Sequence, residues 1–270
     1  MLPVTFARRA YQVATAWNEL TRAQLLRITW LHGQKFTSDR ALDDAFRAVL
    51  LQAPARVLSR LNAVQRVELR RLVPVRFLRE PAEYAPFTEQ LLEYLPYLKW
   101  WQGLGARYYG PRAGFRNLRF AEFIFADAYF LRYLQAGDET QLDRLVATLY
   151  RPQRAGYAPL APDYAGDRRE DFNEHLLEAR ARAVAKQAHH VKYAVLLWYA
   201  GCRRQLETRF EYVFTDANKA TASKAGWGDV LHQMAGSVRA IDATADQYLL
   251  TVLREMNRVL RAADEQPTTR

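Results

Sequence analysis

Apolar residues recur at helical spacing along most of this 270-residue chain. The strongest case is the segment 119–134, which is apolar nearly all round, and a helix of that kind lies in the centre of a core. Residues suited to helix capping precede other apolar stripes, with Thr21 and Gln24 forming one capping-box pattern and Thr244 and Gln247 another. The pattern predicts a mainly α-helical protein, a multi-helix bundle.

The first twenty residues differ from the rest. Residues 3–6 and 11–14 are short β-prone runs, and their spacing predicts a small hairpin. We therefore expect an N-terminal β element over residues 1–20, a helical domain over 21–262 and a disordered tail over 263–270.

Three further helices are expected from spacing and capping. Ser38 or Asp39 caps the first and Asp138 caps the last. Between them, Pro54 begins a helix that ends before Pro74. Its predicted buried stripe consists of Val57, Leu58, Leu61, Val64, Val67 and Leu72.

A long helical pattern runs from Asp171 through Trp198 without Pro or Gly. Its first half is charged and its second half is apolar, with Val191, Ala194, Val195, Trp198 and Cys202 on one face. The pattern predicts one long helix with a buried C-terminal half and an N-terminal half that is solvated or covered by a partner.

Proline, glycine and aromatic residues concentrate in an insert over residues 74–118, and a second Pro/Gly/Tyr loop covers residues 151–168. Aromatic side chains beside flexible backbone either pack inside or form a contact surface. The predicted partner-contact residues are Trp100, Trp101, Tyr108, Tyr109 and Phe115. Gly103 and Gly105 lack the spacing of a dinucleotide-binding loop.

The net charge is +10, and 39 residues are Lys or Arg. Guanidinium groups suit phosphate, so a nucleic-acid patch is one interpretation and solvated helix faces are the favoured one. The candidate patch comprises Arg56, Arg60, Arg66, Arg70 and Arg71, within the basic stretch 56–79. No aromatic residue is interleaved between residues 56 and 76, which disfavours a single-strand stacking groove there.

The sequence also bears on the cellular compartment of the protein and on the chemistry of its cysteine. The longest uncharged apolar run, residues 193–202, is too short to cross a bilayer, which needs about 20 residues. Charged residues follow the N-terminus so closely that the apolar run before them is shorter than that of a signal peptide. A single cysteine, Cys202, excludes an internal disulfide framework. We expect no membrane association and a cytoplasmic protein.

Two carboxylates, Glu122 and Asp127, lie within the most apolar segment. Five helical positions place them about 140° apart, so the two cannot serve one site together. We expect each to pair with an arginine, with Arg116 and Arg119 near in sequence. Asp171 and His175 share a helix face, but the chain lacks the Glu-x-x-His motif of carboxylate bundles. No catalytic, metal-ligating or cofactor-binding residue is therefore predicted, and no cofactor.

Three stretches resemble proteins encoded in phage and prophage tail-gene regions. They are residues 11–21, which end in Trp-Asn-Glu-Leu-Thr, residues 108–123, which begin with Tyr-Tyr-Gly-Pro, and residues 226–236, which begin with Gly-Trp-Gly-Asp. The resemblance implies a tail assembly chaperone or minor structural component whose partners are other tail or assembly proteins. It carries over no catalytic residues.

We therefore expect a non-catalytic tail assembly protein that acts through protein contacts, in the cytoplasm or within a phage-like particle. The alternative is a helical protein that binds nucleic acid through its Arg-rich patch. A metal-dependent bundle enzyme around Asp171, His175, Glu122 or Asp127 is a third, less favoured hypothesis.

Overall fold

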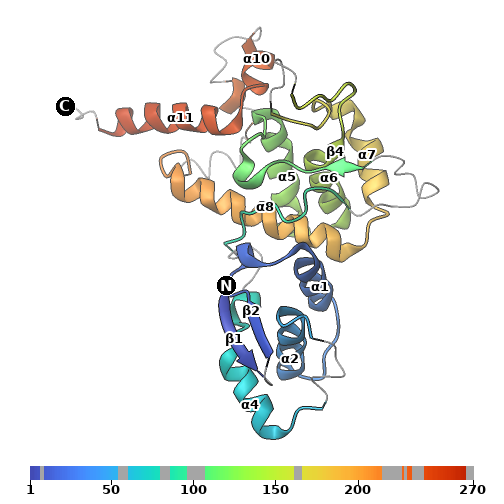
Figure 1. The fold of residues 1–270 in the computed structure, drawn as a ribbon. Helices are drawn as coiled ribbons and strands as arrows, with labels where there is room; N and C mark the ends of the chain where they lie inside the picture. The colour runs from blue at the N-terminus through green and yellow to red at the C-terminus, as the bar shows by residue number, and fades with distance from the viewer. Residues whose placement is uncertain are drawn as a thin grey trace. The chain divides into compact units, whose positions relative to one another are not determined.

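Two units divide the chain in the computed structural model. Unit 1 comprises Met1–Leu92 and Ala188–Gly201, and unit 2 comprises Glu93–Gln187 and Cys202–Arg270. The structure describes residues 1–6, 9–53, 60–79, 86–95, 107–160, 166–214, 227, 230–232 and 240–265. The described part is mainly α-helical with a small N-terminal hairpin, as the sequence predicts (Figure 1). The division differs from the expected boundaries at 20 and 262, since the hairpin and the helices after it belong to one unit.

Unit 1 begins with strands β1 (Leu2–Phe6) and β2 (Arg9–Val13), which pair antiparallel. A short 3-10 helix, η1 (Trp17–Glu19), follows and places Trp17 in the core. The Trp17 indole N–H donates to the carbonyl of Phe77 at 2.9 Å, and its ring packs against Phe77 and Phe87. The buried indole therefore ties the hairpin side of the unit to a segment sixty residues away.

Helices α1 (Arg22–His32) and α2 (Asp39–Leu50) follow in unit 1. The predicted capping box is present, because Thr21 accepts from the Gln24 backbone N–H and Gln24 accepts in return from the Thr21 backbone N–H. Ser38 caps α2 through its side chain. Phe46 and Leu50 provide the buried stripe of α2.

The third helix of unit 1 differs from the prediction. Helix α4 (Ala63–Leu72) starts at an Asn62 capping box, and a 3-10 turn, η2 (Arg76–Arg79), follows it. The predicted stripe is wrong at Val64 and Val67, which are exposed, and Leu69 is the buried residue of α4. Val57 and Leu58 of the predicted stripe lie outside the described residues. Only one face of α4 packs against the core of the unit, and Leu69 lies on that face. Around the helix axis, Leu69 is about 140° from Val64 and about 160° from Val67.

Unit 2 centres on helix α5 (Phe120–Ala136), which lies beside α6 (Glu139–Leu149) (Figure 1). Phe120, Phe123, Ala126 and Phe130 of α5 are buried, which confirms it as a core helix. Asp138 caps α6 as predicted. The remaining elements of unit 2 are β3 (Tyr108–Tyr109), η5 (Ala113–Phe115), β4 (Arg151–Pro152), η6 (Glu174–Leu176), α7 (Leu177–Val184), α10 (Ile241–Ala245) and α11 (Leu249–Asp264).

The predicted long helix is two helices. Helix α7 ends at Val184 and α8 (His189–Arg209) begins after a turn over residues 185–188. That turn contains no Pro or Gly, so local propensity gives no sign of it; Gln187, which is buried, donates its backbone N–H to Val184. The predicted apolar face of α8 is confirmed, since Val191, Ala194, Val195, Trp198 and Cys202 are all buried.

The C-terminal helix also starts differently from the prediction. Thr244 lies inside α10, where its hydroxyl donates to the carbonyl of Ala240, and Tyr248 is the N-cap of α11. Residues 263 and 264 belong to α11, although the sequence predicts a disordered tail from residue 263. Residues 266–270 lie outside the described part. Within the described residues, no helix has the length and apolar composition needed to span a membrane.

Gly201 occupies a position in α8 where another residue does not fit. A Cβ at this position lies 2.2 Å from the carbonyl oxygen of Phe87 and 2.6 Å from its backbone nitrogen. Backbone atoms on a neighbouring segment cannot move aside as a flexible side chain does.

We predict that Gly201→Ala destabilises the protein by about 1–3 kcal/mol, although Ala is otherwise preferred to Gly in helices by about 1 kcal/mol. Urea unfolding followed by circular dichroism measures the change. Gly33→Ala is the control, because its Cβ meets its nearest atom at 3.6 Å and no stability loss is expected. Equal stabilities of the two variants contradict the prediction.

Candidate functional site

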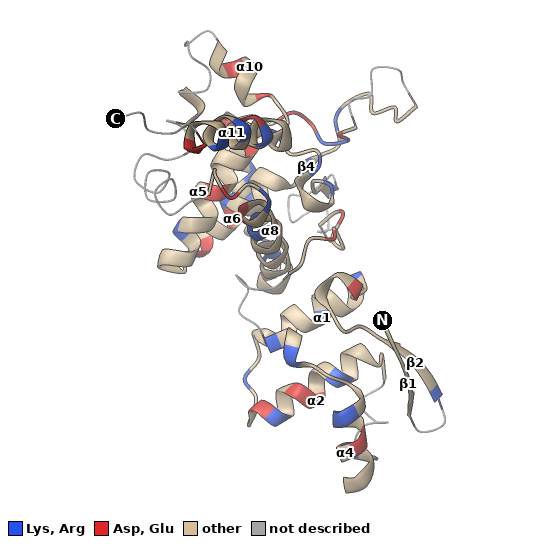
Figure 2. Ribbon diagram, turned by 90° about the vertical axis from the view of Figure 1, so that its left-hand side faces the viewer, with Lys and Arg blue, Asp and Glu red and all other residues tan. Residues whose placement is uncertain are grey.

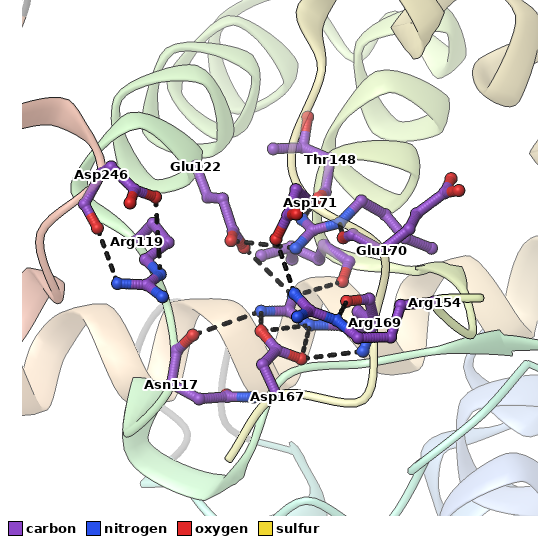
Figure 3. Close-up of polar contacts among 12 residues, drawn as sticks. Asn117, Arg119, Glu122, Thr148, Arg154, Asp167, Arg169, Glu170, Asp171 and Asp246 are labelled. Carbon is purple, nitrogen blue, oxygen red and sulfur yellow. Dashed lines mark hydrogen bonds and ion pairs between the residues drawn. The ribbon is translucent and has the colours of Figure 1, made fainter. Parts of the chain in front are cut away.

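Four fully or largely buried charged side chains form an ion cluster in unit 2: Glu122, Arg151, Asp167 and Arg169. Glu122 comes from the first turn of α5, and Arg151 follows α6 directly in β4. Asp167 and Arg169 come from the chain segment that pairs with residue 153. Figure 3 shows how the side chains converge.

Glu122 is shared between two guanidinium groups. Its Oε1 accepts from Arg151 Nη2 at 2.9 Å, and its Oε2 lies 3.1 Å from Arg169 Nη1. Arg151 also donates to the carbonyls of Thr148 and Glu170. All three charged side chains are at most 1% exposed, so the pairing must offset a large loss of hydration.

Asp167 provides the second carboxylate of the cluster. It accepts from Arg169 Nη2 at 2.7 Å and from the Arg169 backbone N–H at 3.0 Å. Burial raises the pKa of Asp167, but the hydrogen bonds and charge of Arg169 outweigh burial and hold the pKa below its usual value. Burial likewise disfavours the charged form of Arg169, yet Glu122 and Asp167 raise the pKa of the guanidinium. Two negative and two positive charges therefore neutralise one another.

A cavity of about 170 Å³ lies beside the cluster. Glu122 and Arg151 reach it from the core, and Arg119, Arg154, Asp171 and Asp246 lie around it. Arg154 pairs with Asp171 at 2.6 Å, and Arg119 donates to the Asp246 carbonyl at 2.7 Å (Figure 3). Asp242 also lines the cavity and forms no ion pair within the described part of the chain, so these pairs neutralise most of the charge there but not all of it.

Asp127 forms a separate buried contact. It accepts from Arg203 Nε at 2.5 Å and from the Trp227 indole N–H at 2.9 Å. Pairing of both α5 carboxylates with arginine is confirmed, and so is their separation, but the expected partners Arg116 and Arg119 are wrong. The true partners lie between 29 and 76 residues away along the chain.

The remaining metal candidates do not converge. Asp171 pairs with Arg154, and His175 lies exposed in η6. Among the described residues, no group of three His, Cys, Asp or Glu side chains is placed to hold a metal ion.

A row of tyrosines and arginines in contact with one another lies beside the ion cluster; we call it the Tyr–Arg ladder. Arg107 stacks on Tyr94 with 4.9 Å to the ring centroid, and Tyr94 meets Tyr109 edge-on at 6.2 Å. Arg168 lies 3.9 Å over Tyr109 and 5.1 Å from the ring of Tyr157. The rings and Arg168 are half-buried, and Arg107 is exposed.

Backbone pairing brings the ladder residues together. β3 pairs antiparallel with β4, Tyr94 forms a bridge to Tyr109, and Gln153 forms a bridge to Arg169. The adjacent arginines 168 and 169 therefore have separate places, with Arg169 fully buried in the ion cluster and Arg168 half-buried in the ladder. The ion cluster anchors the segment from which the ladder projects.

The predicted partner-contact residues lie in three different kinds of surroundings. Tyr109 lies in the ladder, and Tyr108 is half-buried beside it in β3. Phe115 is fully buried and packs against Phe123, so it is a core residue and offers no contact surface. Trp100 and Trp101 lie outside the described residues.

The residues of the predicted nucleic-acid patch differ in their surroundings. Arg70 binds Asp44 through two hydrogen bonds, and Arg66 donates to the carbonyl of Leu61. Arg60 and Arg71 are exposed, and Arg56 lies outside the described residues.

Sequence reasoning missed most of the site. Its residues Tyr94 and Arg107 come from the insert, for which no regular element is predicted. Four more, Arg151, Tyr157, Asp167 and Arg168, come from the loop over residues 151–168, and Arg169 directly follows that loop. One signal was available, because a carboxylate in an apolar helix requires a cation, and residues 151–169 hold four arginines.

We predict that Glu122→Gln destabilises the protein by about 3–5 kcal/mol, because the amide leaves two buried guanidinium groups without their shared charge. Denaturant unfolding measures the loss. The exposed Glu255→Gln, which also breaks a carboxylate–arginine pair, is expected to leave stability nearly unchanged, because solvent screens that pair. A Glu122→Gln variant as stable as this control contradicts a structural role for the cluster.

Comparison of the chain with protein-family models, curated proteins and solved structures found no match.

Proposed function

We propose that the chain is a non-catalytic protein of phage or prophage tail assembly and that it acts by binding other proteins through the Tyr–Arg ladder. Its partners are tail or assembly proteins, which it meets in the cytoplasm or within a phage-like particle. The ladder is the single observation that carries this proposal.

The composition of the ladder supports a protein contact. Tyrosine and arginine are among the residues enriched where a few side chains supply most of the binding energy of an interface. Tyr94, Tyr109, Tyr157 and Arg168 keep part of their surface in solvent. The ladder also includes Tyr109, within the stretch 108–123 that resembles phage tail-region proteins.

The rigidity of the ladder also supports a protein contact. Stacked rings and guanidinium groups are already ordered before a partner arrives, so little side-chain entropy is lost on binding. The ion cluster fixes Arg169, and with it the neighbouring Arg168. The charged groups of the ion cluster form ion pairs with one another, which favours a structural role of the cluster over a reactive one.

The ladder also gives the nucleic-acid alternative a specific basis. Aromatic faces interleaved with guanidinium groups are typical of surfaces that stack single-stranded bases. The interleaving that the stretch 56–76 lacks is present here. We rank this function second, because guanidinium groups of the ladder already lie over the ring faces of Tyr94 and Tyr109.

We predict that Arg168→Ala weakens binding to a partner from the adjacent tail genes by about 2 kcal/mol, roughly thirtyfold in Kd. Co-expression with those gene products and co-purification identifies the partner, and calorimetry with the purified pair measures the loss. Arg258→Ala, an exposed arginine of α11, is the matched control and is expected to leave Kd unchanged. Equal affinities for both variants, or recovery of no tail protein, contradict the proposal.

A separate measurement tests the second function, nucleic-acid binding. Fluorescence anisotropy with single-stranded and duplex oligonucleotides over a range of salt concentrations gives the slope of log affinity against log salt. We expect only weak non-specific binding, with the same slope for the wild type and for Arg168→Ala. A steep slope that Arg168→Ala reduces by about one phosphate contact favours nucleic acid over protein as the partner.

A further inference from the structure

The outward face of α4 carries apolar side chains in solvent. Val64 is 77% exposed and Val67 is 63% exposed, and their spacing of three residues places them side by side. Arg71 follows on the same face, one turn further along, together with Glu68. The apolar pattern that predicted a buried stripe is therefore real, but it points away from the core of unit 1.

Four arginines of this region differ in their pairing. Those that face α2 are neutralised: Arg70 by Asp44, and Arg79 by Asp39 and Asp43. Those that face solvent, Arg60 and Arg71, form no ion pair with any residue that the structure describes. Figure 2 shows the acidic positions of α2 and the basic positions around α4.

The sequence of unit 1 is strongly basic as a whole. Met1–Leu92 and Ala188–Gly201 contain fifteen basic and eight acidic residues, a net charge of +7 out of the +10 of the whole chain. A partner for the outer face of α4 must therefore offer apolar contacts beside negative charge. The exposed valines disfavour nucleic acid, whose backbone offers phosphates and no apolar surface to them.

Unit 2 presents such a surface over residues 170–178, which we call the acidic turn. It contains four carboxylates, Glu170, Asp171, Glu174 and Glu178. Three of them pair with Arg180, Arg154 and Arg144, while Glu174 forms no ion pair within the described part of the chain. Leu176, two residues along, is 46% exposed.

We propose that the outer face of α4 in one copy of this chain docks on the acidic turn of a second copy, with Val64 and Val67 against Leu176 and Arg71 facing Glu174. Two different surfaces meet in this contact, so the association runs head to tail and can continue from copy to copy. The inference does not rest on the ladder or on the identity of any tail protein.

Sedimentation velocity of the purified protein at increasing concentration tests the proposal. We expect the mean mass to rise with concentration and the association to weaken as ionic strength increases. Val64→Ser combined with Val67→Ser is expected to weaken association by about tenfold or more. Val259→Ser, a 52% exposed valine of α11, is the matched control and is expected to leave association unchanged.

Charge reversal identifies the partner surface. Arg71→Glu alone and Glu174→Arg alone are each expected to remain monomeric, because each places like charges opposite one another. An equimolar mixture of the two variants is expected to associate again, since every contact between one variant and the other pairs opposite charges. Circular dichroism confirms that both exposed substitutions leave the helices formed.

Three outcomes overturn the proposal. The first is a wild-type protein that stays monomeric over the whole concentration range. The second is association that the α4 variants leave unchanged, or a mixture of charge-reversed variants that stays monomeric. The third is a monomeric protein that binds an oligonucleotide through Arg71, which assigns the face to nucleic acid. None of these results bears on whether Arg168 contributes to a tail-protein contact.

Discussion

The organisation of unit 2 depends on one carboxylate, Glu122, which lies between the guanidinium groups of Arg151 and Arg169. The three residues belong to separate segments of the chain, and each charge is buried. An apolar core could stabilise the same volume as well or better, but it would accept many relative positions of the segments. A shared carboxylate accepts only the arrangement in which both arginines reach it, so the cluster fixes position at the expense of some stability.

The surface follows from this constraint. Arg169 is held from below by Glu122 and Asp167, which fixes the backbone on which Arg168 extends over Tyr109. Tyr109 in turn belongs to the strand that pairs with Arg151. The same pairing that buries the ions therefore orders the rings. Unit 1 uses charge differently, because the carboxylates of α2 neutralise Arg70 and Arg79, while Arg71 on the outer face of α4 stays exposed.

The sequence was informative wherever local chemistry determines structure. The Thr21–Gln24 box, the Ser38 and Asp138 caps, the hairpin and the core helix over residues 120–136 all depend on neighbours within a few positions. Prediction from the sequence failed where contacts between distant parts of the chain determine the structure. The turn over residues 185–188 contains no helix breaker, the valines of α4 follow helical spacing yet face outward, and the partners of Glu122 and Asp127 are remote in sequence. The ladder was beyond prediction, because its residues share no local pattern.

The ladder draws its side chains from residues 94, 107–109, 157 and 168, which only the folded unit brings together. It is thus a discontinuous epitope, and no linear peptide cut from the chain reproduces it. An antibody raised against the intact surface would lose its target as soon as unit 2 unfolds. Such a reagent reports the native state in a crude extract without any knowledge of the partner.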